Sequence, residues 1–213
     1  IVTAVDALRR DGLVDEVLVV DDGSSDTTAD RARAAGATVL AGPGGPGKGE
    51  ALARAVAATA AELLVFLDAD VVRFSARFVT DLLAPLLRDP AVQLVKPAYR
   101  RPLDGRPGEG GRVTEILARP LLRRFFPELA GVAQPLAGES ALRRSALTGG
   151  IALAGGYGVE IALLIDVYRR HGRAAVAEVD LGERAHRNRP LHQLRPHSDD
   201  VLAAVLARAT HLA

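Results

Sequence analysis

Short apolar runs and helix-favouring segments alternate through the first half of the chain. The apolar runs predict strands at Glu16–Val20, Thr38–Ala41, Leu63–Leu67 and Val92–Lys96. The segments between them predict helices at Thr27–Ala35, Glu50–Ala61 and Arg77–Leu87. Because strands that are apolar throughout suit a sheet buried on both faces, this pattern predicts an α/β fold: a mostly parallel central sheet with helices on both faces.

The second half of the chain is richer in polar Gly/Pro loops and less regular. A helix is predicted at Val113–Phe125, interrupted by Pro120 because proline lacks the backbone N–H that a helix interior needs. A strand is predicted at Ala174–Asp180, and Ser198 is predicted to cap a final helix. Apolar side chains at helical spacing predict one buried face on each of two helices: Ile161, Leu164, Ile165 and Tyr168 on the first, and Leu202, Val205 and Leu206 on the last.

Composition and charge narrow the class of protein. The 213 residues are 48% hydrophobic, which suffices for a proper core in one domain or two small ones. The net charge of +1 gives no general attraction to nucleic acids or anionic membranes, and the basic stretch Arg184–Arg195 lacks interleaved aromatic side chains. No apolar run reaches the roughly 18 residues of a transmembrane helix, and no signal peptide is visible. The absence of cysteine excludes disulfides and suits a cytoplasmic protein.

Acidic residues follow two of the predicted strands. Asp21 and Asp22 come directly before Gly23, and Asp68 and Asp70 flank Ala69. Open α/β sheets bind ligands beyond the carboxyl ends of their strands, and alternate acids at a strand end can both point toward one cleft. A hard cation such as Mg²⁺ is held there by one or two carboxylates together with substrate phosphates. The alternative is that these acids cap helices or lie in solvated turns.

The glycine-rich loop Gly42–Gly49 contains a candidate phosphate-binding lysine. Its spacing follows the phosphate loop of nucleoside triphosphatases as far as Lys48, but Gly49 stands where that motif needs Ser or Thr for Mg²⁺. A triphosphatase is therefore kept as an alternative, beside a plain flexible loop. A third interpretation is that Lys48 reaches the diphosphate of a nucleotide sugar. Lys48 and Lys96 are the two lysines among 27 basic residues, so each raises the question of why arginine does not stand there.

Four further residues could bind a ligand or a metal. Arg112 and Thr114 lie at the start of a predicted helix, where backbone N–H groups and a guanidinium suit an anion, although they also suit a solvated cap. Glu160 follows the glycine-rich turn Gly155–Gly158 and could meet a sugar hydroxyl or simply favour the helix dipole. His186 could bind a metal or be a structural histidine.

Taken together, these segments resemble the glucosyl-3-phosphoglycerate synthases, which are actinobacterial retaining glycosyltransferases. They occur in family order across nearly the whole chain, which is far more specific than any single motif. The matching segments are Val20–Ser24, Pro46–Leu52, Asp68–Asp70, Gln93–Lys96, Gly110–Glu115, Ala118–Leu122, Gln134–Leu136, Gly156–Ile161 and Arg184–Pro190.

The resemblance implies a GT-A fold and a reaction. Glucose would pass from UDP-glucose to the 2-hydroxyl of 3-phosphoglycerate, with retention of configuration and with Mg²⁺ or Mn²⁺ as cofactor. Residues 1–100 would form the nucleotide-sugar-binding half and residues 101–213 the acceptor-binding half. The family begins with a strand that this chain, which starts at Ile1, does not contain, and it often has Ser at the position of Asp22. A homodimer is also implied.

The resemblance also implies roles for individual residues. The metal would be held by Asp70 and His186, and the catalytic residues would be Lys48, Asp70 and Glu160. The donor would be bound by Asp22, Gly23, Lys48, Asp68, Ala69, Asp70, Tyr157 and Glu160. The acceptor would be bound by Gly111, Arg112, Val113, Thr114, Arg184 and Asn188. The alternatives are a transferase that uses GDP-mannose or another glycerate-like acceptor, the triphosphatase, and a non-catalytic nucleotide-sugar-binding relative.

Overall fold

The computed structural model describes residues 2–10, 12, 14–42, 47–69, 71, 74–100, 111–148, 150–183 and 191–209. Its α-helices are α1 (Val2–Arg10), α2 (Thr28–Ala34), α3 (Lys48–Ala57), α4 (Arg77–Arg88), α5 (Arg119–Phe125), α6 (Val159–His171) and α7 (Leu191–Ala209). Its strands are β1 (Leu18–Asp21), β2 (Thr38–Ala41), β3 (Leu63–Phe66), β4 (Leu94–Arg100), β5 (Ser140–Arg143) and β6 (Val176–Glu183). Its short turns are the π-helical η1 (Thr114–Ala118) and the 3₁₀-helical η2 (Pro127–Leu129), η3 (Arg144–Leu147), η4 (Gly156–Gly158) and η5 (Arg173–Ala175).

The described strands form two sheets. The larger has the order β3-β5-β4-β6, in which β4 and β6 are parallel and β5 runs antiparallel between β3 and β4. The strands β3, β4 and β6 therefore point the same way, as the sequence predicts. The smaller sheet is the parallel pair β1 and β2. The strand β5 was not predicted, because four residues that pair with β3 and β4 carry no distinctive pattern of their own.

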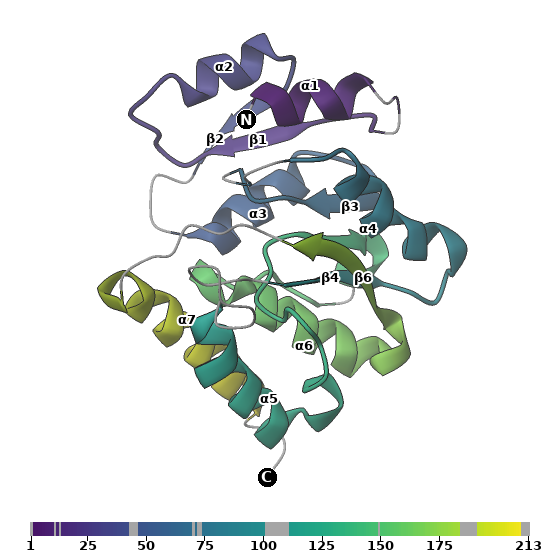
Figure 1. Cartoon of the computed structure of the whole chain (residues 1–213), viewed down its shortest axis with the longest axis vertical. Helices are drawn as coiled ribbons and strands as arrows, with labels where there is room; N and C mark the ends of the chain where they lie inside the picture. The colour runs from purple at the N-terminus through teal and green to yellow at the C-terminus, as the bar shows by residue number, and fades with distance from the viewer. Residues whose placement is uncertain are drawn as a thin grey trace.

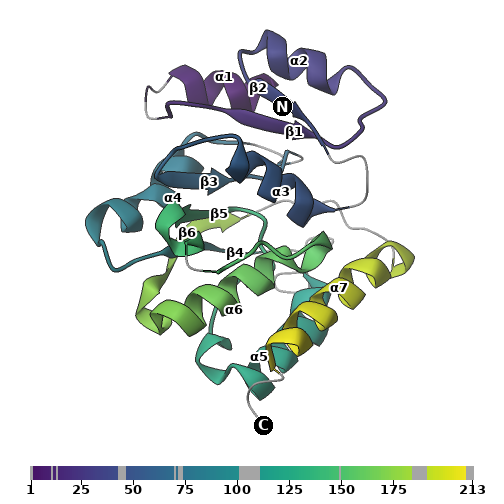
Figure 2. The same ribbon diagram turned by 180° about the vertical axis from the view of Figure 1, so that it is seen from behind.

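Helices cover both faces of the larger sheet, which confirms the predicted layers. One face packs Leu64, Leu94 and Leu142 against α5, α6 and α7. The opposite face packs Val95 and Ala141 against the apolar side of α4. This division follows from the alternation of side chains along a strand, since neighbouring residues point to opposite faces. Figures 1 and 2 show α5, α6 and α7 together on one side of the sheet in both views.

The helices α1 and α2 form a separate small layer with β1 and β2. Both views place this layer at the end of the molecule opposite α5 and α7 (Figures 1 and 2). Its buried apolar residues are Val5, Ala32 and Ala37, which pack together, and Leu8, which packs with the residues of α4. In the part of the chain that the structure describes, no helix combines the length and apolar character needed to cross a membrane.

The final helix differs from its prediction. It begins at Leu191, so Ser198 lies inside it, and its hydroxyl donates a hydrogen bond to the Leu194 carbonyl oxygen at 3.0 Å instead of capping an end. The predicted cap was wrong because a serine in a helix interior can bond back to the preceding turn. The buried face is also shifted: Val205 is buried, whereas Leu202 and Leu206 are 37% and 43% exposed.

The other local predictions agree better with the structure. The strand at Thr38–Ala41 has the predicted bounds. Of the predicted buried face of α6, Ile161, Leu164 and Ile165 are fully buried, whereas Tyr168 is half-buried. Pro120 does disturb its helix: the π-helical turn η1 directly precedes α5, whose first residues include this proline. Because proline cannot donate to the fourth carbonyl before it, the helix widens there instead of continuing unchanged.

Candidate active site

Three predicted site residues from distant parts of the chain meet at the side chain of Lys48. Its Nζ lies 2.6 Å from Oδ1 of Asp68 and 2.7 Å from Oε1 of Glu160. Lys48 is the first residue of α3, Asp68 follows β3, and Glu160 lies in the first turn of α6. Lys48 and Asp68 are about a quarter exposed, at 25% and 23%, and Glu160 is 9% exposed. The cluster therefore borders the surface and remains open to a ligand.

The charge of Lys48 is held by its two carboxylate partners. Burial by itself lowers the pKa of a lysine, but the charges of Glu160 and Asp68 outweigh it and raise the pKa of Lys48 well above its usual range. Lys48 is consequently a fixed cation at every physiological pH. A fixed cation beside the carboxyl end of β3 can stabilise the negative charge of a phosphate group.

Gly138 borders this cluster and was not among the predicted site residues. The antiparallel register pairs Phe66 with Ser140, so Asp68, two residues after Phe66, lies beside Gly138, two residues before Ser140. A Cβ atom at Gly138 would collide with the Asp68 carboxylate and with Nζ of Lys48. The ion pair thus requires glycine here. A glycine shortly after the matched segment Gln134–Leu136 was the only signal in the sequence.

A second lysine, Lys96, supports the segment that carries Gly138. The Lys96 side chain is 1% exposed, and its Nζ donates to the carbonyl oxygen of Ala137 at 2.7 Å. Glu139 is also buried, and the Tyr99 hydroxyl donates to its Oε2 at 3.4 Å. Buried polar groups of this kind fix a backbone position because they would be costly without partners. Lys96 and Glu139 therefore support the site from inside the sheet.

The turn before α6 brings Tyr157 close to Glu160. The Tyr157 ring packs against the His197 ring of α7, with centroids 3.6 Å apart and an angle of 34° between the planes. Gly49 faces this region from α3: a side chain there would collide with the carbonyl group of Ala154. Close backbone approach thus explains why glycine, and not Ser or Thr, follows Lys48.

The predicted acceptor residues lie at the start of the helical segment that precedes α5. Gly111 has a φ of +76°, and Thr114 is 3% exposed, while Arg112 and Val113 are half-buried. The structure therefore places Thr114 mostly inside the protein. Gly111, Arg112 and Val113 are more accessible than Thr114.

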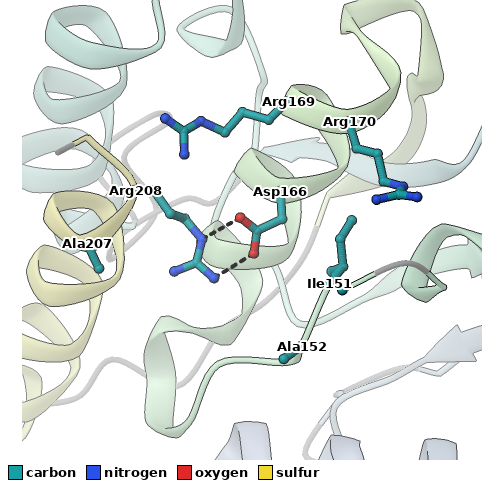
Figure 3. Close-up of a pocket in the computed structure, with 8 residues that line it drawn as sticks. Ile151, Ala152, Asp166, Arg169, Arg170, Ala207 and Arg208 are labelled. Atoms are coloured by element: carbon teal, nitrogen blue, oxygen red, sulfur yellow. Dashed lines mark hydrogen bonds and ion pairs between the residues drawn. The ribbon is translucent and has the colours of Figure 1, made fainter. Parts of the chain in front are cut away.

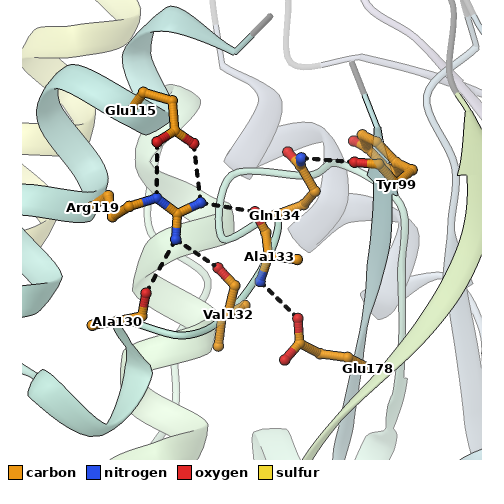
Figure 4. A network of polar contacts seen from close by, with 8 residues as sticks. All are labelled: Tyr99, Glu115, Arg119, Ala130, Val132, Ala133, Gln134 and Glu178. Carbon is orange, nitrogen blue, oxygen red and sulfur yellow. Dashed lines mark hydrogen bonds and ion pairs between the residues drawn. The ribbon is translucent and has the colours of Figure 1, made fainter. Parts of the chain in front are cut away.

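Arg119 anchors this segment to the rest of the protein (Figure 4). Its guanidinium donates to both carboxylate oxygens of Glu115 at 3.0 Å and to the carbonyl oxygens of Ala130, Val132 and Ala133 at 3.1, 3.4 and 3.2 Å. The backbone N–H of Ala133 in turn donates to Glu178 of β6 at 2.7 Å. A planar guanidinium with several fixed acceptors is well ordered. It connects the acceptor segment to the sheet.

Comparisons with known proteins agree with this arrangement. The family model described as Glycosyl transferase family 2 matches residues 1–148. The glucosyl-3-phosphoglycerate synthase of Mycobacterium tuberculosis H37Rv is 50% identical over 212 residues, which cover 93% of this chain and 65% of that protein. The synthase of Mycolicibacterium smegmatis is 50% identical over 208 residues, which cover 92% of this chain and 68% of that protein. The chain belongs to the glucosyl-3-phosphoglycerate synthase group of glycosyl transferase family 2.

A solved structure extends the likeness to three dimensions. It is the M. tuberculosis glucosyl-3-phosphoglycerate synthase in complex with Mn²⁺, UDP-glucose and phosphoglyceric acid. It matches with a TM-score of 0.85 and 45% identity, over 97% of this chain and 75% of that one. The α/β fold predicted from the sequence is thereby confirmed. The chain spans 65% of the length of its M. tuberculosis relative.

Membership in family 2 removes the triphosphatase alternative. The prediction came from the glycine spacing that ends at Lys48. In the structure Gly49 cannot carry the Ser or Thr of a phosphate loop, because the Ala154 carbonyl group occupies that space. The loop spacing therefore matched by coincidence.

Several predicted residues stay outside the cluster or outside the described chain. Asp22 and Gly23 follow β1 and are exposed, and Gly42 at the end of β2 packs against Asp22. Ala69 is exposed directly after Asp68. Asp70, Arg184, His186 and Asn188 lie outside the described residues. Within the described ranges no three His, Cys, Asp or Glu side chains form a metal-binding group, so the metal ligands remain predictions for this family member.

A cavity of about 520 Å³ lies elsewhere, between α6 and α7. Figure 3 shows Asp166 of α6 facing Arg208 of α7, which form a two-bonded ion pair at 2.8 and 2.5 Å. None of the residues that line this cavity belongs to the Lys48 cluster. The ion pair between Asp166 and Arg208 joins α6 and α7 at a distance from the candidate active site.

Proposed function

We propose that this chain forms the catalytic part of a retaining, metal-dependent glycosyltransferase that moves glucose from UDP-glucose to the 2-hydroxyl of 3-phosphoglycerate. The observation that carries the proposal is the cluster in which Lys48 joins Asp68 and Glu160. It unites a cation, a strand-end carboxylate and a second carboxylate at one edge of the sheet. The M. tuberculosis relative was crystallised with Mn²⁺, UDP-glucose and phosphoglyceric acid, which supports the same substrates here.

The donor side of the site follows from the charges. Lys48 would meet the diphosphate and stabilise the negative charge that develops on the departing UDP. Glu160, which already neutralises Lys48, suits hydrogen bonding to the glucose better than nucleophilic attack. Asp22 and Gly23 would lie on the uridine side, at the end of β1. Tyr157 would border the sugar from the turn before α6.

A divalent cation fits the chemistry of the residues at the end of β3. Asp68 is engaged by Lys48, so Asp70 and His186 are the residues that would hold the ion. Carboxylate and imidazole ligands suit Mg²⁺ or Mn²⁺ when substrate phosphates complete the coordination. When bound, the ion would offset the charge of the diphosphate.

The acceptor side would be built on the segment before α5. Gly111, Arg112 and Val113 offer backbone groups and a guanidinium to the phosphate of 3-phosphoglycerate, and Arg184 and Asn188 would complete the pocket. Thr114 would support it mainly from inside. A guanidinium and helix-terminal N–H groups together favour a phosphate over a neutral acceptor. The homodimer and the cytoplasmic location remain predictions.

The proposal is tested with the full-length protein in two steps. Calorimetry with UDP-glucose, GDP-mannose and ATP, each with Mg²⁺, should show binding of UDP-glucose alone. Glucose transfer to 3-phosphoglycerate should then require the metal and fall by about 10²-fold or more in Asp70→Ala, because a metal ligand is lost. Preferred binding of GDP-mannose, or transfer by Asp70→Ala at the wild-type rate, would contradict the donor or the metal assignment respectively.

The acceptor assignment has its own test. Arg112→Ala should raise the KM for 3-phosphoglycerate by about tenfold, because a charge-assisted hydrogen bond contributes about 1.5–3 kcal/mol. The KM for UDP-glucose should stay near its wild-type value. An equal change in both constants would show that Arg112 does not act on the acceptor.

A further inference from the structure

The glycine-rich turn before α6 is held by carboxylates from two other helices. The backbone N–H of Gly156 donates to Oε2 of Glu50 in α3 at 3.0 Å. The next backbone N–H, that of Tyr157, donates to Oδ2 of Asp200 in α7 at 2.8 Å. Two consecutive peptide groups are thus bound by residues 106 and 43 positions away in the sequence.

The glycines of this turn are shaped around the two carboxylates. A Cβ atom at Gly155 would lie 2.5 Å from Oε1 of Glu50. A Cβ atom at Gly156, whose φ is +65°, would collide with the Asp200 carboxylate. At Gly158 it would lie 2.7 Å from the Asp200 carbonyl oxygen. The glycines therefore permit a close approach that any other residue would prevent.

The first turn of α3 contacts both Glu160 and the glycine-rich turn before it. Lys48 is the first residue of α3 and binds the Glu160 carboxylate, while Glu50, in the same helical turn, binds the peptide group of Gly156. These two contacts fix both ends of the short segment from Gly156 to Glu160. The position of Glu160 relative to Lys48 thus depends on Glu50.

The contact with α7 acts on Tyr157. Asp200 binds its backbone, and His197, one helical turn earlier in α7, packs on its ring. Tyr157 is therefore held by one helix at two points, its backbone N–H and its ring. Its direction is set by α7 and not by the turn alone.

We propose that Glu50 and Asp200 are positioning residues that hold the turn Gly155–Gly158 so that Tyr157 and Glu160 face the donor sugar beside Lys48. This role rests on the proposed glucosyl transfer from UDP-glucose. Neither carboxylate reaches the Lys48 cluster itself, so both act through the backbone. The hydrogen bond from Gly156 lowers the pKa of Glu50, so the Glu50 side chain is a charged carboxylate at neutral pH.

The test compares alanine and amide variants of both residues in the full-length protein. Glu50→Ala and Asp200→Ala should each raise the KM for UDP-glucose by about tenfold, because one charge-assisted hydrogen bond is lost. The KM for 3-phosphoglycerate should change by less than about twofold, since the predicted acceptor residues Gly111–Thr114 belong to the segment before α5 and not to this turn. Glu50→Gln and Asp200→Asn keep an acceptor oxygen and should recover most of the loss. Hydrogen exchange of the turn should be faster in the alanine variants.

Asp166→Asn is the matched control. It weakens the ion pair between Asp166 of α6 and Arg208 of α7, which lies away from the candidate active site. It should lower the melting temperature and leave both KM values unchanged. If the alanine variants behave in the same way, with lower stability and an unchanged KM for UDP-glucose, the two residues only hold the fold and the positioning role is wrong.

The two proposals fail in different ways. A wild-type protein that transfers no glucose would overturn the proposed function and, with it, the role of the turn toward the sugar. A wild-type protein that transfers glucose, with alanine variants that keep the wild-type KM for UDP-glucose, would overturn the positioning role alone. In both cases the exchange rates show whether the carboxylates hold the turn.

Discussion

At the scale of single residues, the two lysines show why a rare residue type can be informative. Lys48 places a compact ammonium group between two carboxylates, in a space that Gly138 leaves open. Lys96 places its ammonium group inside the sheet, where it donates to the Ala137 carbonyl oxygen. A guanidinium is larger and planar, so arginine would not fit either space without rearrangement. The chain uses arginine where a forked donor is needed, as at Arg119.

Gly138→Ala should disable the cluster. The new methyl group would collide with Asp68 and Lys48 and separate them. We expect glucose transfer to fall by about 10²-fold, comparable to the loss of one positioned charge in an active site, and the free energy of unfolding to fall by about 1–3 kcal/mol. Steady-state kinetics and denaturant unfolding measure the two effects.

Gly131→Ala is the control for this prediction. Gly131 has open space around its Cα and no positive φ. Alanine there should change the free energy of unfolding by less than about 0.5 kcal/mol and leave transfer unchanged. Wild-type activity in Gly138→Ala would show that the ion pair tolerates the methyl group, contrary to the geometry.

The raised pKa of Lys48 predicts a specific dependence of stability on pH. A folded-state pKa above the unfolded value of 10.5 means that the charged lysine stabilises the fold at lower pH and loses this contribution as the pH rises. The difference in unfolding free energy between wild type and Lys48→Met should be constant from about pH 7 to 9 and shrink above about pH 10. A difference that grows with rising pH would have the wrong sign.

At the scale of elements, the segment from η1 to α5 shows how a helix irregularity is stabilised. The π-helical turn Thr114–Ala118 leads into the helix that contains Pro120. Directly after the turn, Arg119 binds Glu115 and three carbonyl groups of the loop that follows α5. The irregular turn therefore has tertiary support where its own hydrogen bonding is weaker. Such turns recur at functional sites, and this one adjoins Arg112 and Val113.

Arg119→Ala should affect both stability and the acceptor site. Removing the guanidinium, which is 18% exposed, leaves the carbonyl groups without their donor, so we expect a loss of about 2–3 kcal/mol of unfolding free energy. The KM for 3-phosphoglycerate should rise by about fivefold or more, because the start of η1 is less well held. Arg123→Ala, an exposed position on the same helix, should change stability by less than about 0.5 kcal/mol.

At the scale of the whole molecule, the three apolar clusters differ greatly in size. The face of the larger sheet toward α6 is backed by a long set of fully buried side chains, including Leu94, Leu142 and Ile161. The layer of α1, α2, β1 and β2 has a cluster of its own with only Val5, Ala32 and Ala37 buried, and Leu8 of α1 joins the cluster of α4. Because local stability follows buried apolar contact, the small layer should open more readily.

Hydrogen exchange can measure this difference. Backbone amides of β1 and β2 should exchange at least about tenfold faster than those of β4 and β6, because a smaller apolar cluster opposes their opening. If UDP-glucose binds near the end of β1, adding it with Mn²⁺ should slow exchange in β1 more than in α5. Uniform exchange in both sheets would mean that the molecule opens as one unit.

The sequence by itself determined the local elements and the order of the motifs. Apolar runs located β2 and β3 within a residue, since strand formation there follows from short-range patterning and burial on both faces. Apolar spacing predicted the buried face of α6. The sequence also singled out Asp68 and Lys48, which the structure brings together at the carboxyl end of β3, whereas Asp22 after β1 stays outside their cluster.

Only the tertiary structure decided which of these residues meet. The contacts of Lys48 with Asp68 and Glu160 close loops across much of the chain, and no local pattern encodes them. The strand β5 and the requirement for Gly138 arise from pairing with β3. The start of α7 and the interior place of Ser198 depend likewise on packing. Propensity acts within a few residues, whereas a site is built by side chains whose neighbours are set by the whole fold.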